Sequence, residues 1–145
     1  MASKILETNV AIEYLRQGFK ETKQKINNLI EQGYDLKITQ ITACELWYGV
    51  YRLPTKAKVL AEARKLTKFL QNLTEILTMD SLSSKIYGEI CAELDKKGLR
   101  VPQFDLLIAS MAIANEIPLI TKDKRHFPRI NALSEYDFLE MWDAE

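Results

Sequence analysis

Very short apolar runs alternate along this chain with longer stretches in which apolar residues recur at helical spacing. The short runs predict strands, and the longer stretches predict amphipathic helices. Parallel strands are joined by crossovers of about a dozen residues or more, usually helical, and parallel sheets are covered on both faces. The alternation therefore predicts an α/β fold in which a mainly parallel sheet of short strands lies between two layers of helices.

The pattern predicts about five strands and about six helices. A side-chain oxygen of Thr8 or Asn9 is expected to open the first helix, and Gly18 to end it. The expected strands are 4–6, 36–38, 76–77 and 118–120, with a last strand or turn in the acidic tail 135–145. The other expected helices are 21–31, 42 to the stop at Pro54, 59–70, 82 to the stop at Gly98, and 104–111.

The size and charge of the chain limit what it can bind. Its 145 residues fit a single domain, 1–145. Twenty Lys and Arg residues balance twenty Asp and Glu residues, so the formal net charge at pH 7 is zero. A chain of this kind has no overall field that attracts nucleic acid. Any polyanion must therefore be held by a local basic patch or through metal ions.

The few histidine and cysteine residues exclude further classes of site. His126, Cys44 and Cys91 do not supply the ligands of a structural zinc site or the pairs of a disulfide framework. The first residues lack the apolar stretch of a secretory signal. The longest nearly apolar run, 106–114, is well short of the roughly 20 residues that span a membrane. We therefore expect a soluble protein in a reducing, cytoplasmic setting.

Four acidic residues, each next to apolar neighbours, stand where a predicted strand ends or a predicted helix begins. They are Glu7, Glu45, Asp105 and Asp123. The carboxyl ends of parallel strands form a common crevice, so these acids are expected to converge although they are far apart in sequence. Crowded carboxylates repel one another unless a cation neutralises them. Oxygen ligands without histidine favour Mg²⁺ or Mn²⁺.

Each acid taken alone also has a purely structural interpretation. Residues 42–45 (Thr-Ala-Cys-Glu) match a capping box, in which Glu45 would only return a hydrogen bond to the start of its helix. Asp105 would be favoured by the helix dipole in a first helical turn. Asp123 would suit an Asx turn, and Glu7 a solvated strand end. Only the combination of the four acids indicates a site.

Four segments in a fixed order span nearly the whole chain: 5–10 (ILETNV), 42–46 (TACEL), 105–109 (DLLIA) and 121–127 (TKDKRHF). In this order they resemble the PIN-domain ribonucleases, most closely the VapC-type toxins of bacterial and archaeal toxin–antitoxin pairs. The resemblance implies a three-layer α/β/α PIN-like domain with a sheet of about five strands.

The resemblance also implies a metal-dependent endoribonuclease that serves as the toxin of such a pair. In it, Glu7, Glu45, Asp105 and Asp123 would hold one or two Mg²⁺ or Mn²⁺ ions. Ions of this kind bridge a scissile phosphate, lower the pKa of a bound water and stabilise the leaving oxygen. The neighbouring residues Thr8, Asn9 and Thr121 would orient the acids or contact phosphate, besides any capping or turn role.

One residue departs from the family pattern. The first acid of the family is normally aspartate, and this chain has Glu7. The fold assignment does not depend on this residue, but full catalytic activity does, because the first acid supplies a principal metal ligand in the family.

The densest basic cluster of the chain lies next to the fourth acid. It contains Lys122, Lys124 and Arg125, with His126 and Arg129 close by. We expect the first three to form a rim that contacts RNA phosphates, with a solvated charged face as the alternative. No paired Ser or Cys nucleophile accompanies His126, so no catalytic role is assigned to it.

Three aromatic residues, Trp47, Tyr48 and Tyr51, recur at helical spacing. Aromatic side chains can stack on unpaired RNA bases. The spacing is more typical of a protein core or a subunit interface, and we expect one of these two roles.

The resemblance implies three partners: an RNA substrate, a VapB-type antitoxin that wraps the toxin, and a second copy in a homodimer. An arginine of the antitoxin is able to replace the missing cation among crowded carboxylates. A catalytically weakened module that binds RNA or an antitoxin without cleaving is the alternative. A phosphoacceptor signalling domain also gathers acids at strand ends, but it requires adjacent acids after the first strand, and Thr8 and Asn9 do not supply them.

Overall fold

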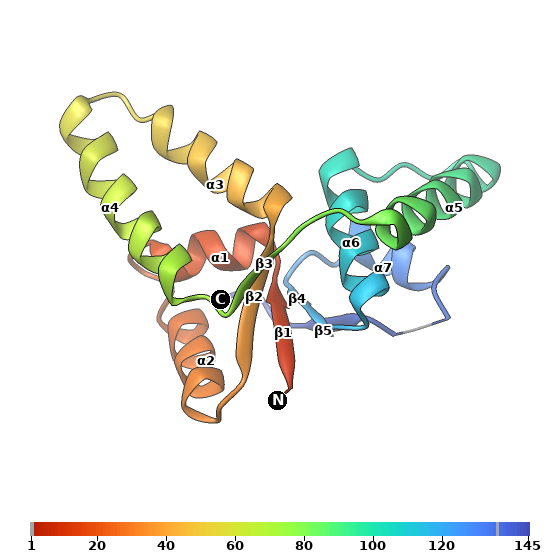
Figure 1. Ribbon diagram of the computed structural model, residues 1–145, viewed down its shortest axis with the longest axis horizontal. Helices are drawn as coiled ribbons and strands as arrows, with labels where there is room; N and C mark the ends of the chain where they lie inside the picture. The colour runs from red at the N-terminus through yellow and green to blue at the C-terminus, as the bar shows by residue number, and fades with distance from the viewer. Residues whose placement is uncertain (1, 136) are drawn as a thin grey trace.

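The computed structural model describes residues 2–135 and 137–145 and shows three layers, with a sheet between two groups of helices (Figure 1). The sheet has five strands in the order β3-β2-β1-β4-β5. Each neighbouring pair is parallel, which confirms the predicted α/β class and sheet. The strands are β1 (Ser3–Leu6), β2 (Asp35–Thr39), β3 (Glu75–Leu77), β4 (Leu119–Thr121) and β5 (Leu139–Met141).

Seven helices in the described residues form the outer layers. Helices α1 to α4 lie on one side of the sheet, and α5 to α7 lie on the other (Figure 1). In the part of the chain described, no helix is long and apolar enough to cross a membrane. The helices are α1 (Thr8–Leu15), α2 (Lys20–Glu31), α3 (Gln40–Tyr51), α4 (Lys56–Asn72), α5 (Ser81–Lys97), α6 (Gln103–Asn115) and α7 (His126–Asn131).

The central strands send alternate side chains into two separate cores. Leu6, Ile38 and Ile120 pack with the α1–α4 layer. Ile5 and Leu119 pack with the α5–α7 layer. All five side chains are completely buried. Because both faces of the sheet are covered, these strands have no polar side, and they appear in the sequence as short apolar runs.

The first helix differs from the prediction at both ends. Its N-cap is Glu7 rather than Thr8 or Asn9, because the Glu7 Oε2 atom accepts a hydrogen bond from the Asn9 N–H at 2.8 Å. The helix ends at Leu15, and Gly18, with a φ of 97°, lies in the turn beyond it. Glu7 therefore joins the end of β1 to the start of α1, which places it at the carboxyl edge of the sheet.

The third helix also begins earlier than predicted. Its N-cap is Thr39, whose Oγ1 atom accepts a hydrogen bond from the Thr42 N–H at 3.2 Å. Thr42 therefore lies inside the helix and is not its cap. The capping-box interpretation of Glu45 is wrong for this reason, since a capping box requires Thr42 to be the first, non-helical residue.

The aromatic residues of α3 do not all enter the core. Trp47 packs against the α1–α4 core, and its ring stacks on that of Tyr51 with centroids 5.8 Å apart. Tyr48 and Tyr51 are each 68% exposed, so a core role is wrong for both. The subunit-interface role of these two tyrosines stays a prediction.

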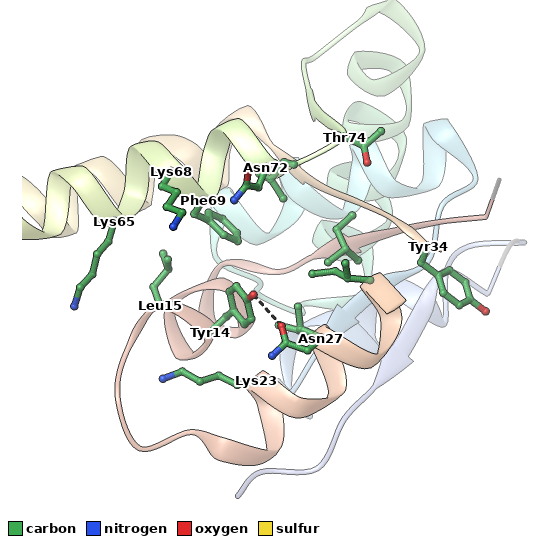
Figure 2. Close-up of a pocket in the computed structure, with 14 residues that line it drawn as sticks. Tyr14, Leu15, Lys23, Asn27, Tyr34, Lys65, Lys68, Phe69, Asn72 and Thr74 are labelled. Atoms are coloured by element: carbon green, nitrogen blue, oxygen red, sulfur yellow. Dashed lines mark hydrogen bonds between the residues drawn. The ribbon is translucent and has the colours of Figure 1, made fainter. Parts of the chain in front are cut away.

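A pocket of about 780 Å³ opens beside α1, α2 and α4 (Figure 2). Tyr14 and Asn27 face each other in it, and the tyrosine hydroxyl donates a hydrogen bond to the Asn27 Oδ1 atom at 3.1 Å. The four acids predicted for the site do not line this pocket. Its lining combines apolar residues (Leu15, Ile26, Ile30, Leu36, Phe69 and Leu73) with three lysines (Lys23, Lys65 and Lys68).

Replacing Thr39 with valine keeps the shape of the side chain but removes the oxygen that caps α3. We expect the free energy of unfolding to fall by about 1 kcal/mol, because the buried Thr42 N–H loses its partner. Glu45→Gln serves as the comparison and should not lower the free energy of unfolding. Urea unfolding in EDTA measures both variants. Equal losses would contradict the assignment of Thr39 as the cap.

Candidate active site

The four predicted acids lie at the carboxyl edge of the sheet. β1 pairs with β2 on one side and with β4 on the other. The boundary between β1 and β4 is thus a topological switch point, where open α/β sheets bind their ligands. Glu7 follows β1, Asp123 follows β4, Glu45 comes from α3, and Asp105 comes from the first turn of α6.

Glu7 is the most deeply buried of the four, with 3% of its surface exposed. Its Oε2 atom accepts from the Asn9 N–H, and its Oε1 atom accepts from the Thr121 hydroxyl at 3.1 Å. Burial raises the pKa of Glu7 to about 7, and the charges of Asp105 and Asp123 add to this increase, whereas the two hydrogen bonds oppose it. A substantial fraction of Glu7 is therefore protonated at neutral pH.

Asp123 forms the turn after β4 and faces the site as well. Its Oδ1 atom accepts from the backbone N–H groups of Arg125 at 2.8 Å and His126 at 3.1 Å, which is an Asx turn. Burial by itself would raise the pKa of Asp123. The hydrogen bonds from Arg125 and His126 outweigh burial and hold the pKa below its ordinary value. The structural role predicted for Asp123 thus coexists with its place in the site.

Asp105 lies close to the same turn. Its Oδ2 atom is 3.8 Å from the Nδ1 atom of His126. Burial raises the pKa of Asp105 to about 6; the charges of Asp123 and Glu45 add to the increase, and His126 opposes it. The helix-dipole interpretation of Asp105 fits its place in the first turn of α6. Burial and the neighbouring negative charges nevertheless leave its pKa raised.

Two linked threonine hydroxyl groups hold the Glu45 carboxylate by hydrogen bonds. The Thr8 Oγ1 atom donates to the Glu45 Oε1 atom at 2.7 Å. The hydroxyls of Thr8 and Thr42 are 2.9 Å apart, so Thr42 supplies the proton of that contact. Thr8 and Thr42 are both buried, and they join the starts of α1 and α3. These hydroxyl groups fix the Glu45 carboxylate, which interacts electrostatically with Asp105.

The structure adds His126, for which the sequence pattern predicts no catalytic role. Its Nδ1 atom lies 3.0 Å from the Asp123 Oδ2 atom. Asp105, Asp123 and His126 each contribute one potential ligand atom, and these three atoms lie within 4.8 Å of one another. The sequence holds one signal for this contact, because His126 follows Asp123 by three residues. In a turn that leads into a helix, this spacing brings the imidazole ring next to the carboxylate.

The chemistry of these donors fits a divalent cation. The pKa values of Glu7 and Asp105 are raised partly because negative groups are held close together, and a cation reverses that effect. The side chains of Asp105, Asp123 and His126 are 23%, 21% and 26% exposed, so an ion has access to them. A mainly carboxylate set favours Mg²⁺ or Mn²⁺, and Mn²⁺ also accepts an imidazole ligand.

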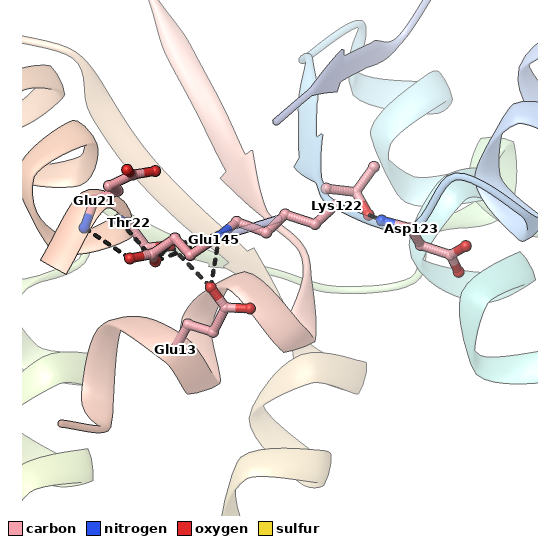
Figure 3. Close-up of polar contacts among 7 residues, drawn as sticks. Glu13, Glu21, Thr22, Lys122, Asp123 and Glu145 are labelled. Atoms are coloured by element: carbon pink, nitrogen blue, oxygen red, sulfur yellow. Dashed lines mark hydrogen bonds and ion pairs between the residues drawn. The ribbon is translucent and has the colours of Figure 1, made fainter. Parts of the chain in front are cut away.

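The predicted basic rim is only partly present. The ammonium group of Lys122 turns away from Asp123 and meets Glu13 (Figure 3). Its side chain is 10% exposed, so Lys122 is not available as a rim residue. Lys124 and Arg125 are exposed, and Lys124 lies 3.7 Å from Asp143.

The three residues predicted to orient the acids differ in whether their side chains bond to an acid. Thr8 and Thr121 each donate to an acid of the site, as expected for groups that orient carboxylates. Asn9 contributes its backbone N–H to Glu7, and the residue itself is exposed. Among the described residues, no hydrogen bond joins the Asn9 side chain to the acids.

Comparison with known proteins identifies the relatives of the chain. Residues 4–133 match the PIN domain family. Ribonuclease VapC2 of Rickettsia felis is 35% identical over 141 residues, 96% of this chain and 97% of that protein. The tRNA(fMet)-specific endonuclease VapC of Shigella flexneri is 27% identical over 95% of this chain and 99% of that protein.

Solved structures agree with these sequence matches. VapBC2 from Rickettsia felis, bound to a DNA fragment from its promoter, has a TM-score of 0.82 and 33% identity, covering 97% of this chain and 99% of that one. DNA-bound VapBC from Salmonella typhimurium has a TM-score of 0.80 and 27% identity, covering 98% and 99%.

The raised pKa of Glu7 predicts how stability varies with pH in the absence of metal. The pKa of Glu7 is about 7 in the folded protein, and its ordinary value, which applies to the unfolded chain, is 4.5. Between pH 4.5 and pH 7 the folded state therefore binds more protons than the unfolded state. Stability should therefore fall as the pH rises from about 5 to about 7.5. Glu7→Gln cannot ionise, and it should be more stable than the wild type by up to about 3 kcal/mol near pH 8. Thermal unfolding in EDTA measures the difference, and parallel curves for the two proteins would contradict the assigned environment of Glu7.

Proposed function

The chain belongs to the PIN domain family, and from this premise we propose that it is a metal-dependent endoribonuclease, the toxin of a toxin–antitoxin pair. The observation that carries the proposal is the cluster of Asp105, Asp123 and His126 at the switch point of the sheet, with Glu7 and Glu45 near enough to interact electrostatically with Asp105. Relatives that match across nearly their full length are named ribonucleases or endonucleases. We further propose that 1–145 forms one nuclease domain and that its RNA substrate places it in the cytoplasm.

The proposed cofactor is Mg²⁺ or Mn²⁺, held by Glu7, Glu45, Asp105 and Asp123. His126 is added to this set because its ring lies beside two of the acids. A bound ion of this kind supplies Lewis acidity and a water of lowered pKa for attack on an RNA phosphodiester.

The residues of the chain prepare the site for that chemistry. Thr121 and the Asn9 N–H fix the two oxygens of Glu7, and Thr8 fixes the Glu45 carboxylate. Each acid therefore has a defined orientation before substrate binds, which reduces the reorganisation required during reaction. The exposed Lys124 and Arg125 are the remaining candidates for contact with RNA phosphates.

The proposed protein partner is a VapB-type antitoxin, since similar solved structures are VapBC complexes. The pocket beside α1, α2 and α4 suits an amphipathic segment of such a partner: apolar side chains would fill it, and acidic ones would meet Lys23, Lys65 and Lys68. An antitoxin arginine would neutralise the acids in place of the metal. A homodimer is also proposed, with the exposed Tyr48 and Tyr51 as candidate contact residues.

The alternative, a module that binds RNA or an antitoxin without cleaving, is not favoured, because the matched relatives are named ribonucleases. The phosphoacceptor alternative is excluded by the family assignment.

Asp105→Asn tests the metal site, because it removes one charge and keeps the shape of the side chain. The variant should lose RNA cleavage and should melt at a higher temperature than the wild type in EDTA, where Asp105 is repelled by its neighbours. The wild type should gain thermal stability in millimolar Mn²⁺, because an ion that binds only the folded state stabilises it, and the variant should gain less. Cleavage of total cellular RNA and thermal unfolding are the measurements.

Asp95→Asn is the matched control, since Asp95 is an exposed aspartate of α5 outside the site. It should retain cleavage and the full response to Mn²⁺. Intact RNA cleavage by Asp105→Asn would contradict the proposed site. A wild-type melting temperature that does not change when Mn²⁺ is added would contradict it as well.

Glu7→Asp tests the departure from the family pattern. The glutamate is one methylene longer than aspartate, which moves its carboxylate by up to about 1.5 Å, and a misplacement of about 1 Å can cost on the order of a hundredfold in rate. We expect Glu7→Asp to cleave RNA at least about tenfold faster at saturating Mn²⁺, with little change in RNA affinity. Parallel time courses on total cellular RNA measure the rates. Equal rates would show that the site tolerates glutamate, and slower cleavage would contradict its assignment as the first ligand.

A further inference from the structure

A second charged cluster lies next to the candidate active site, on the opposite side of the chain segment that carries Asp123. The Lys122 Nζ atom is 2.7 Å from the Glu13 Oε1 atom, 2.7 Å from the Thr22 Oγ1 atom and 3.6 Å from the Glu145 Oε2 atom. The charged side chains are mostly buried: Lys122 is 10%, Glu13 20% and Glu145 19% exposed. A buried lysine with two carboxylates is a costly arrangement unless the partners are well fixed.

The carboxylates of this cluster are fixed by the start of α2. The Glu145 side chain accepts hydrogen bonds from the backbone N–H groups of Glu21 at 3.0 Å and Thr22 at 3.2 Å (Figure 3). The Thr22 hydroxyl lies 2.9 Å from Glu13 and 2.8 Å from Glu145. Lys122 therefore joins the segment after β4 to α1, to α2 and to the segment after β5.

The same short segment is held from its other side by the acidic site. The Thr121 hydroxyl donates to Glu7 and accepts from the Asp123 N–H at 3.1 Å. The side chains of Lys122 and Asp123 point in opposite directions (Figure 3). Residues 121–123 are thus fixed on one side by the acids and on the other side by the lysine cluster.

We propose that Lys122 is a positioning residue that fixes Asp123 for metal binding through its contacts with Glu13, Thr22 and Glu145. It acts on the backbone of the segment and does not touch the metal or the RNA. The inference rests on the proposed function of Asp123 as a metal ligand. It also replaces the role in a phosphate-contacting rim that the sequence suggested for Lys122.

Loss of the lysine charge has a definite physical consequence. Glu13 and Glu145 lie within hydrogen-bond distance of one hydroxyl, so without Lys122 they repel each other at short range. Their separation removes the anchor on one side of residues 121–123. Partners that orient a metal ligand typically contribute a factor of about 10 to 100 in metal affinity.

The experiment compares Lys122→Met with Lys37→Met. Methionine keeps the apolar stem and removes the charge. Lys37 is a matched control, because its side chain is 15% exposed and its ammonium lies 3.0 Å from Glu75, away from the acids. We expect Lys122→Met to bind Mn²⁺ at least about tenfold more weakly and Lys37→Met to bind it like the wild type. Titration calorimetry measures the affinities, and RNA binding is measured separately in EDTA.

Two further variants keep the test decisive if Lys122→Met does not fold. Lys122→Arg retains the charge and should retain Mn²⁺ affinity. Glu13→Ala removes the oxygen that Lys122 contacts at 2.7 Å and should weaken Mn²⁺ binding in the same direction as Lys122→Met. Wild-type Mn²⁺ affinity in Lys122→Met or Glu13→Ala would overturn the proposal. Weaker RNA binding by Lys122→Met in EDTA, with unchanged Mn²⁺ affinity, would also overturn it and restore the rim interpretation.

Hydrogen exchange separates this proposal from the proposed function. The N–H groups of Asp123 and Arg125 are hydrogen-bonded within the segment, so their exchange reports how well it is fixed. In metal-free protein they should exchange faster in Lys122→Met than in the wild type or Lys37→Met. If wild-type protein binds no Mn²⁺, the proposed function fails while this faster exchange still supports the anchor. Unchanged exchange would show that Lys122 does not fix the segment.

Discussion

The burial and crowding of carboxylates at the sheet edge are the constraint on which the rest of the site depends. Four acids from separate parts of the chain lie close enough that Asp105 interacts electrostatically with each of the other three. In a folded protein this arrangement costs free energy unless a cation is bound or a proton is retained. Burial raises the pKa values of Glu7 and Asp105, and the neighbouring negative charges add to the increase, so protons relieve part of the cost at moderately acidic pH. The fold must therefore supply enough stability elsewhere to hold the acids together.

That stability comes from features that surround the acids without belonging to them. The two cores bury both faces of β1 and β4, so the positions of Glu7 and Asp123 are set by rigid strands. Hydroxyl groups of Thr8 and Thr121 hold the glutamates in place. On the far side of β4, Lys122 ties the Asp123 segment to α1 and α2. A site assembled from distant parts of the chain is precise only when each part is anchored in this way.

The sequence predicted the fold class, the strands and the convergence of the acids, because these depend on apolar periodicity and on the topology of parallel sheets. It misplaced the caps of α1 and α3, since several neighbouring residues carry a suitable oxygen and only the three-dimensional start of each helix selects Glu7 and Thr39. It also grouped Lys122 with Lys124 and Arg125 by proximity in sequence. Alternation of side chains along an extended segment sends Lys122 to the side opposite Thr121 and Asp123. Two of its partners there, Glu13 and Thr22, are 109 and 100 residues away in sequence, which no local pattern reveals.

We infer that the buried, crowded acids retain protons that a bound metal ion displaces. Calorimetric titration of Mn²⁺ in buffers of different ionisation enthalpy measures this directly, because released protons are taken up by the buffer. With the pKa of Glu7 about 7 and that of Asp105 about 6, binding should release about one proton near pH 6.5 and almost none near pH 8.5, where both acids are already ionised. Binding heats that are independent of the buffer at both pH values would show that the acids hold no displaceable proton, and would contradict the account.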